Sequence, residues 1–187
     1  MPKPTAQRNF SDPESRIMKG HDGFVQAYNA QAAVDATAQV IVAHHMTNNA
    51  ADQDALAPLL DAVTANTGVT PAEVSADSGY CSEANLADLA GRGIRGYVAT
   101  GRAKHPDGGE DRRRGPLVAA MRQRLRRAGR RSRYRLRKQI VDPVFGQIKG
   151  ARGFRQFLLR SLEKVKHEWA LVCTAHNLTK LARAAAA

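Results

Sequence analysis

The sequence is short of cysteine and has no long apolar run, and each lack excludes a class of protein. Its 187 residues include two cysteines, Cys81 and Cys173. Two cysteines are too few for a disulfide framework, and these two lack the spacing of a metal-binding pair. No stretch approaches the roughly 18 apolar residues that a membrane-spanning helix needs, and residues 1–8 are no secretory signal. We therefore expect a cytoplasmic chain with unreactive thiols.

Acidic residues are scarce in the second half of the chain, where basic residues gather. Residues 1–100 hold 6 Lys and Arg against 11 Asp and Glu, a net charge of −5, whereas residues 101–187 hold 23 against 6, a net charge of +17. Residues 112–138 contain 13 basic residues and no acid. Nearly all are Arg, which binds phosphate through two parallel hydrogen bonds. A solvated basic face is the alternative, but so dense a run favours a nucleic-acid partner.

The apolar pattern predicts alternating strands and helices. Residues 1–22 are polar and without periodicity, so we expect an irregular segment there. β-Branched residues and turn signals predict strands over 23–35, 39–46, 73–76 and 94–100, the first two forming a hairpin. Helical spacing and capping residues predict helices over 49–65, 82–90, 116–127, 132–149 and 161–186, and residues 102–115 read as a loop. This order is typical of an α/β layer structure.

Some of these helices carry finer expectations. Asn48 or Asn49 is the expected N-cap of the first helix. Pro143 should kink the helix over 132–149 or mark its restart. On the last helix, the expected apolar side consists of Val165, Trp169, Val172, Cys173 and Leu178. Trp169 and Phe154 could stack on bases, but a packed core role is the preferred interpretation.

Asp77 is the carboxylate of the first half that is best placed for chemistry. It follows an expected strand and begins a turn that contains glycine, which is where α/β folds present ligands. The alternative is structural: Asp77 caps the helix that begins near Ser82 or closes a local turn. Position alone does not separate the two interpretations.

Asp142 is the only acid between Asp111 and Glu163. On a regular helix it shares a face with Lys138, Phe145 and Lys149. By itself this pattern favours surface ion pairs over a metal site. Considered together with Asp77, it suggests phosphodiester chemistry, which uses two Mg²⁺ or Mn²⁺ ions held by carboxylates.

Five segments in order resemble the catalytic domain of DDE transposases from bacterial insertion sequences. They are NFSDPESR at 9–16, GFVQAYNAQAAVD at 23–35, ADSGY at 76–80, DPVFGQIK at 142–149 and RGFR at 152–155. The similarity runs over essentially the whole chain. It implies an RNase H-like fold, a mixed sheet flanked by helices, over residues 23–187. It also implies a transposase that cleaves and transfers DNA strands.

The resemblance implies roles for particular residues. Asp77 corresponds to the second catalytic acid and Asp142 to the third, and both would bind Mg²⁺ or Mn²⁺. Lys149 matches the basic residue seven positions after the third acid. Tyr134 and Arg137 keep the spacing of the upstream pair, although Arg137 lies one residue too far from Asp142. Together with the basic block 112–138, the expected DNA-binding residues are Arg130, Arg131, Arg133, Tyr134, Arg135, Arg137, Lys138, Lys149, Arg152 and Arg155.

The chain departs from the family pattern in two places. The third acid is normally Glu, and Asp142 is shorter by one methylene, roughly 1.5 Å of reach. The strand that carries the first acid should precede Gly23, and nothing there resembles it. Asp35 is the one alternative for the first acid, but the resemblance puts it at the end of the second strand instead. We therefore expect a truncated front, without the family's N-terminal DNA-binding helices, and an exposed sheet edge that promotes association.

Three functions follow as hypotheses. The first is a transposase fragment that acts on transposon-end and target DNA, associated with the nucleoid and forming a homo-oligomer. The second is an inactive remnant that only binds DNA. The third, unrelated to transposition, is an RNA-binding basic protein in which Asp77 and Asp142 are structural. His44 and His45 are adjacent on a strand, point to opposite faces and cannot chelate one metal together.

Overall fold

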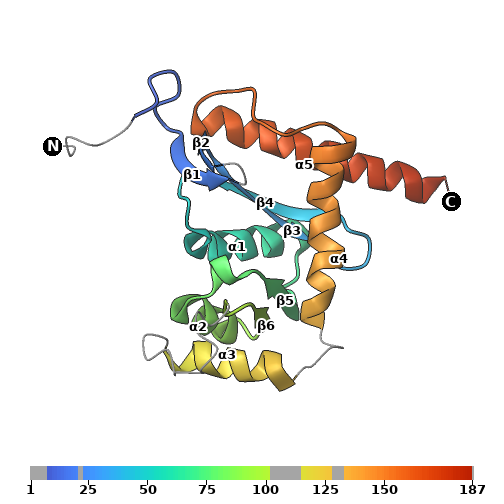
Figure 1. Cartoon of the computed structure of the whole chain (residues 1–187). Coiled ribbons are helices and arrows are strands. Elements are labelled where there is room, and N and C mark those ends of the chain that lie inside the picture. Colours follow the sequence, from blue (N-terminus) through green and yellow to red (C-terminus); the bar gives the residue numbers. More distant parts are fainter. Residues whose placement is uncertain (1–7, 21–22, 102–114, 128–132, 187) are drawn as a thin grey trace. The chain divides into compact units, whose positions relative to one another are not determined.

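Figure 1 shows a computed structural model of the chain, which is built from α-helices and short strands. The structure describes residues 8–20, 23–101, 115–127 and 133–186, with the backbone alone over 133–138. These residues form three two-stranded sheets and five α-helices, so the expected α/β class is confirmed. None of the described helices is both long and apolar enough to cross a membrane. The expected loop at 102–115 lies almost wholly outside the described residues.

The chain divides into two compact units, and the first combines residues 1–50 with residues 146–187. Its strands form two antiparallel hairpins. In one, β1 (Arg16–Gly20) pairs with β2 (Gly23–Ala27), and in the other β3 (Asn29–Val34) pairs with β4 (Ile41–Thr47). The hairpin expected around residues 36–38 is therefore confirmed as β3–β4.

Two expectations about the first strands need correction. Residues 16–20 are not irregular, because pairing with β2 supplies the backbone hydrogen bonds of a strand that has no clear pattern of its own. Residues 23–35 form two strands and not one. The break is at Tyr28, whose buried hydroxyl donates a hydrogen bond of 2.7 Å to Asp12. That contact is between segments far apart in sequence, and periodicity does not reveal it.

The helix α5 (Leu162–Ala185) packs on β4 and completes the first unit. Its buried face is formed by Val165, Trp169, Cys173 and His176. The Trp169 indole donates to the backbone oxygen of Gln31 at 3.0 Å, so the core role expected for Trp169 is confirmed. Leu178, expected on the same face, is 59% exposed, because α5 turns His176 and Asn177 toward the strand instead. Burial raises the pKa of the Cys173 thiol to about 12.

The second unit, residues 51–145, places helices around a parallel strand pair. The strand β5 (Glu73–Ala76) pairs in parallel with β6 (Arg95–Val98), close to the expected bounds. The core lies among β6 and three helices, α1 (Leu56–Thr67), α2 (Glu83–Gly91) and α3 (Pro116–Arg127). Its buried members are Leu56, Leu60, Leu86, Leu89, Ile94, Val98, Val118 and Met121. A parallel pair with a helical crossover is the α/β unit that the element order predicts.

The first helix of this unit starts later than expected. A short 3₁₀ turn, η1 (Asp52–Ala55), precedes α1, and neither Asn48 nor Asn49 caps it. The buried residues Leu56, Leu59, Leu60 and Val63 recur at helical spacing, so burial of this face determines the helix. Gly68 ends it with a positive φ of 71°, as expected of a C-terminal glycine.

The helix α4 (Arg133–Gly146) passes through Pro143 without a restart. Proline has no backbone N–H, so the helix loses one hydrogen bond, the one to the carbonyl four residues earlier. The next residue, Val144, is fully buried, and its burial offsets part of that loss. The irregularity comes after Gly146, where Gln147–Ala151 form a π-helical turn, η3.

Candidate metal and DNA-binding sites

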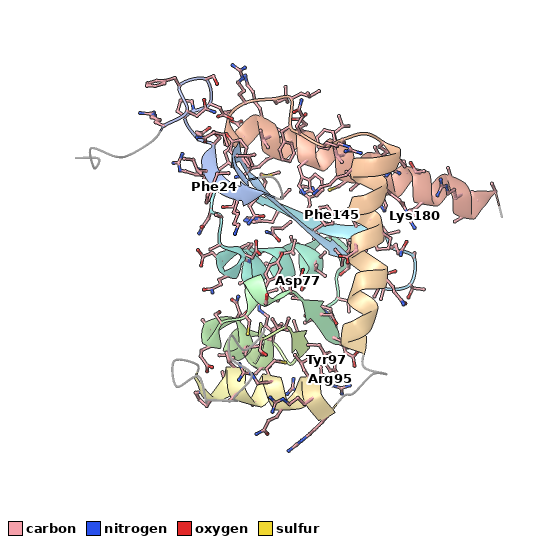
Figure 2. The ribbon with its side chains drawn as sticks, in the orientation of Figure 1. Phe24, Asp77, Arg95, Tyr97, Phe145 and Lys180 are labelled. Atoms are coloured by element: carbon pink, nitrogen blue, oxygen red, sulfur yellow. The ribbon has the colours of Figure 1, made fainter. Side chains whose placement is uncertain are left out.

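Asp77 lies where the chain leaves β5, at the carboxyl end of the parallel strand pair (Figure 2). Its backbone is extended, with φ −74° and ψ 169°, and it begins the short turn η2 (Ser78–Tyr80). Its side chain is exposed and makes no capping hydrogen bond to that turn. The cap of α2 is Ser82, whose hydroxyl accepts from the backbone N–H of Asn85 at 3.1 Å. Asp77 therefore does not cap α2, which removes one structural explanation for it.

A second carboxylate, Asp52, packs against the turn that follows Asp77. A Cβ at Gly79 would collide with the Asp52 carboxylate, so glycine is required here for close approach rather than for backbone conformation. Burial and then the charge of Asp52 raise the pKa of the Tyr80 hydroxyl well above its usual value. Asp52 belongs to η1 and comes close to this turn only through tertiary packing. The glycine in Asp77-Ser78-Gly79-Tyr80 was the one sequence signal for such an approach.

Asp142 lies on the last turn of α4 with its side chain exposed. None of the ion pairs among described side chains includes it. The face expected to continue from Asp142 to Lys149 is not regular, because α4 ends at Gly146 and Lys149 belongs to the π turn. A π turn holds more residues per turn than an α-helix, so an interval of seven residues no longer returns to the same face. The side chain of Lys138 lies outside the described part.

The acids are oxygen donors of the kind that Mg²⁺ takes. Mg²⁺ keeps several waters and is held by one or two carboxylates together with substrate phosphates. Asp77 and Asp142 are exposed carboxylates of the second unit, so each can offer oxygens to such an ion. Among the described side chains, no three of His, Cys, Asp or Glu gather into a metal site. The described side chains therefore do not supply a complete set of metal ligands.

Asp35, the other candidate acid of the first half, has a structural role. The Asp35 carboxylate accepts from the backbone N–H groups of Thr37 at 3.0 Å and Ala38 at 2.7 Å, so it shapes the β3–β4 turn. His44 is exposed and His45 is half-buried. Desolvation lowers the pKa of both, which for His45 is reinforced by the charge of Lys166.

The basic residues are distributed over both units. In the second unit, α3 exposes Arg124, Arg126 and Arg127. In the first unit, Lys149 and Arg155 are exposed, and the Arg155 Nε donates to the Lys149 backbone oxygen at 3.2 Å. Seven other expected DNA-binding residues lie outside the described side chains: Arg130, Arg131, Arg133, Tyr134, Arg135, Arg137 and Lys138.

Arg152 differs from the other expected contacts because it is half-buried. Its Nη1 lies 3.2 Å from Nδ1 of His176, and Nε2 of the same ring lies 2.9 Å from the Gln39 backbone oxygen. Since a carbonyl only accepts, Nε2 carries the proton and Nδ1 accepts from the guanidinium. Burial, followed by the charges of Arg152 and Lys180, lowers the pKa of His176. Arg152 is thus anchored to the core of its unit at the start of the loop before α5.

The model of one protein family, described as transposase DDE domain, matches residues 3–178. The chain belongs to this family. Transposases act on DNA, so membership implies that the chain binds DNA. The phosphates of DNA are opposite in charge to the basic surfaces of this transposase domain. Comparisons with curated proteins and with solved structures give no match.

Proposed function

We propose that this transposase domain catalyses metal-dependent DNA strand cleavage and strand transfer, with Asp77 and Asp142 as its metal-binding acids. The observation that carries the proposal is the position of Asp77. It is an exposed carboxylate at the carboxyl end of β5, beside the parallel strand β6, while Ser82 caps the following helix. The carboxyl end of a parallel strand is where α/β folds bind ligands. We also propose the RNase H-like fold that the family resemblance implies, although the described strands form three separate two-stranded sheets.

The chain's own residues would hold the metal and the DNA. Asp77 and Asp142 supply carboxylate oxygens, and the close approach of Asp52 to Gly79 adds negative charge beside Asp77. When bound, Mg²⁺ or Mn²⁺ activates the attacking oxygen and stabilises the leaving oxygen of the phosphodiester. The arginines of residues 112–138, with Lys149 and Arg155, hold phosphates and position the strand.

A cleavage assay on transposon-end DNA with Mg²⁺ or Mn²⁺ tests the proposal. Asp77→Asn and Asp142→Asn should each lower the rate by at least about a hundredfold, because a neutral amide is a far weaker ligand for a hard cation. The matched control is Asp61→Asn, an exposed acid of the same unit that pairs with Arg92. The control should keep the rate, since surface pairs contribute little.

The outcomes separate the rival functions. If the unchanged chain binds the DNA but shows no cleavage with either metal, the catalytic claim fails and a DNA-binding role without catalysis stands. If Asp61→Asn lowers the rate as much as Asp77→Asn, the assignment of Asp77 fails. Tighter binding to RNA than to duplex DNA in a salt titration would favour the RNA-binding alternative.

A further inference from the structure

Two exposed leucines lie in the loop that precedes α5. This loop, residues 152–161, runs back along the first half of α5 (Figure 1). Leu158 is 75% exposed and Leu159 is 46% exposed. Single exposed leucines are common on protein surfaces, but adjacent ones form an apolar projection that water solvates poorly.

The backbone that carries these leucines is fixed by Glu168 of α5. One carboxylate oxygen accepts from the N–H of Leu158 at 2.9 Å, and the other accepts from the N–H of Leu159 at 3.0 Å. The residue before them, Phe157, turns inward and meets Trp169 edge to face at 6.4 Å between ring centroids. Phe154 meets Phe157 in the same way at 5.6 Å. The leucines therefore project from a backbone that is anchored to the core of its unit.

Both ends of the loop are held as well. At its start, the Phe154 N–H donates to the Ile148 backbone oxygen at 3.1 Å. At its end, the Ser161 N–H donates to Asp12 at 3.2 Å and the Leu162 N–H donates to Glu14 at 2.9 Å. Because the loop is already ordered, burying its leucines on a partner would not cost the entropy of ordering a mobile segment.

Cations flank the leucines. Arg155, Arg160 and Lys164 are exposed on this loop and on the first turn of α5, where Glu163 is the one exposed acid. The nearby carboxylates of Glu168 and Glu14 accept hydrogen bonds from backbone N–H groups, so both acids are engaged within the protein. The partner that fits is a polyanion with an apolar interior. Duplex DNA has phosphates on the outside and stacked bases within.

We propose that Leu158 and Leu159 form a wedge that inserts between base pairs and kinks the bound DNA, with Arg155 and Arg160 on the adjoining phosphates. Apolar side chains used in this way unstack a base step, and the bent duplex gains contact with the protein. Pyrimidine–purine steps unstack most easily and are the preferred point of insertion. The inference rests on the DNA-binding part of the proposed function and is independent of the metal-binding acids.

The test uses the full chain, without metal, and a short duplex carrying 2-aminopurine beside a TA step. Unstacking raises the fluorescence of this base analogue. The unchanged chain should raise it several-fold, and the double variant Leu158→Ala/Leu159→Ala should leave it near the level of free duplex. The same variant should weaken binding by roughly three- to tenfold, because apolar burial and unstacking largely offset each other.

Two further variants separate the wedge from charge and from general hydrophobicity. Leu171→Ala/Leu178→Ala removes two exposed leucines of α5, 70% and 59% exposed, and should behave like the unchanged chain. Arg155→Ala/Arg160→Ala should lower the slope of log affinity against log salt by about two.

Each contrary outcome has a distinct meaning. Unchanged fluorescence enhancement in the Leu158→Ala/Leu159→Ala variant, with binding intact, overturns the wedge and leaves the proposed function standing. If this variant instead turns an oligomer into a monomer with no change in DNA unstacking, the leucines bind a second copy and the wedge is overturned. Failure of the unchanged chain to bind duplex DNA overturns both proposals.

Discussion

At the scale of the residue, the proposed metal-binding role of Asp142 depends on one methylene, because the resemblance implies Glu as the third acid. The carboxylate of Asp142 is exposed on α4 and reaches roughly 1.5 Å less far than a Glu carboxylate would. Metal positions in phosphoryl-transfer sites tolerate only about 0.5 Å of displacement. The shorter side chain should therefore limit the rate wherever the helix backbone does not move closer.

We therefore expect Asp142→Glu to raise the cleavage rate, by roughly tenfold or more, because it restores reach without changing charge. The measurement is single-turnover cleavage of transposon-end DNA in Mn²⁺. Asp88→Glu, a change of the same kind on α2, is the control and should leave the rate unchanged. A lower rate in Asp142→Glu would mean that the helix is already placed for the shorter acid.

The buried ring of His176 makes stability depend on pH. Its folded pKa lies below the usual 6.5 because the ring is buried and faces Arg152 and Lys180. Between the two pKa values the unfolded chain binds more protons than the folded chain, so stability must fall as the pH falls. The stabilisation from the neutral His176 ring is fully present above about pH 6.5 and is lost progressively below it. Burial lowers the pKa values of His44 and His45 in the same direction.

We therefore predict that urea unfolding of the first unit shows lower stability at about pH 5 than at about pH 7. His176→Gln should reduce this difference, since glutamine can donate to the Gln39 oxygen but does not titrate in this range. His167→Gln, at an exposed position of the same helix, should retain the full difference. Equal pH dependence in the two variants would show that His176 does not contribute.

At the scale of the element, distant acids stabilise helix starts. The N-terminus of α3 begins with Pro116, which has no N–H, and the next two N–H groups are bound by Glu83 of α2 at 3.1 and 2.8 Å. Asp12 and Glu14 bind the N–H groups of Ser161 and Leu162 at the start of α5 in the same way. A helix start attracts negative charge through its unpaired N–H groups and its dipole. These acids therefore connect elements rather than perform chemistry.

The arrangement predicts that Glu83→Ala destabilises the second unit by about 1–2 kcal/mol, the usual cost of a lost helix cap. Glu83→Gln should cost less, because the amide oxygen still accepts one bond. Urea denaturation followed by circular dichroism measures both. Asp61→Ala, which removes only a surface pair with Arg92, should cost well under that amount. A similar loss in Glu83→Ala and Asp61→Ala would contradict the capping role.

At the scale of the whole molecule, charge is the dominant property. The net charge is +12, and residues 101–187 carry the whole excess. Some arginines are neutralised within the chain: Arg92 pairs with Asp61 and Asp88, and Arg95 pairs with Glu73. Residues 112–138 contain no acid that could neutralise their arginines locally. We therefore expect these arginines to bind DNA phosphates.

Affinity for duplex DNA should therefore fall by about a thousandfold or more between about 50 and 200 mM salt. Replacing Arg130, Arg131, Arg133 and Arg135 by Ala should reduce the slope of log affinity against log salt by about four, if each binds one phosphate. The control is Arg92→Ala/Arg95→Ala, whose charges are already paired. Fluorescence anisotropy at several salt concentrations gives the slopes. An unchanged slope in the fourfold variant would mean that these arginines do not bind DNA.

The sequence by itself determined the elements whose signals are local. The strand Glu73–Ala76 and the helix Pro116–Arg127 follow from β-branched residues, apolar spacing and capping chemistry. The five ordered segments likewise indicate the family from the sequence alone. Local signals act within a few residues, which is why reading along the chain suffices for them.

Only the tertiary structure decided which distant groups meet. Periodicity does not reveal that Asp52 approaches Gly79 or that Tyr28 donates to Asp12. It also does not reveal that Glu168 accepts from the backbone of Leu158 and Leu159. Tertiary packing also split residues 23–35 into two strands and exposed Leu178 on a helix whose polar His176 and Asn177 face the strand. A buried polar group must find its hydrogen-bond partner wherever the fold supplies one. That requirement is satisfied across long stretches of chain, and here it overrode the local apolar pattern.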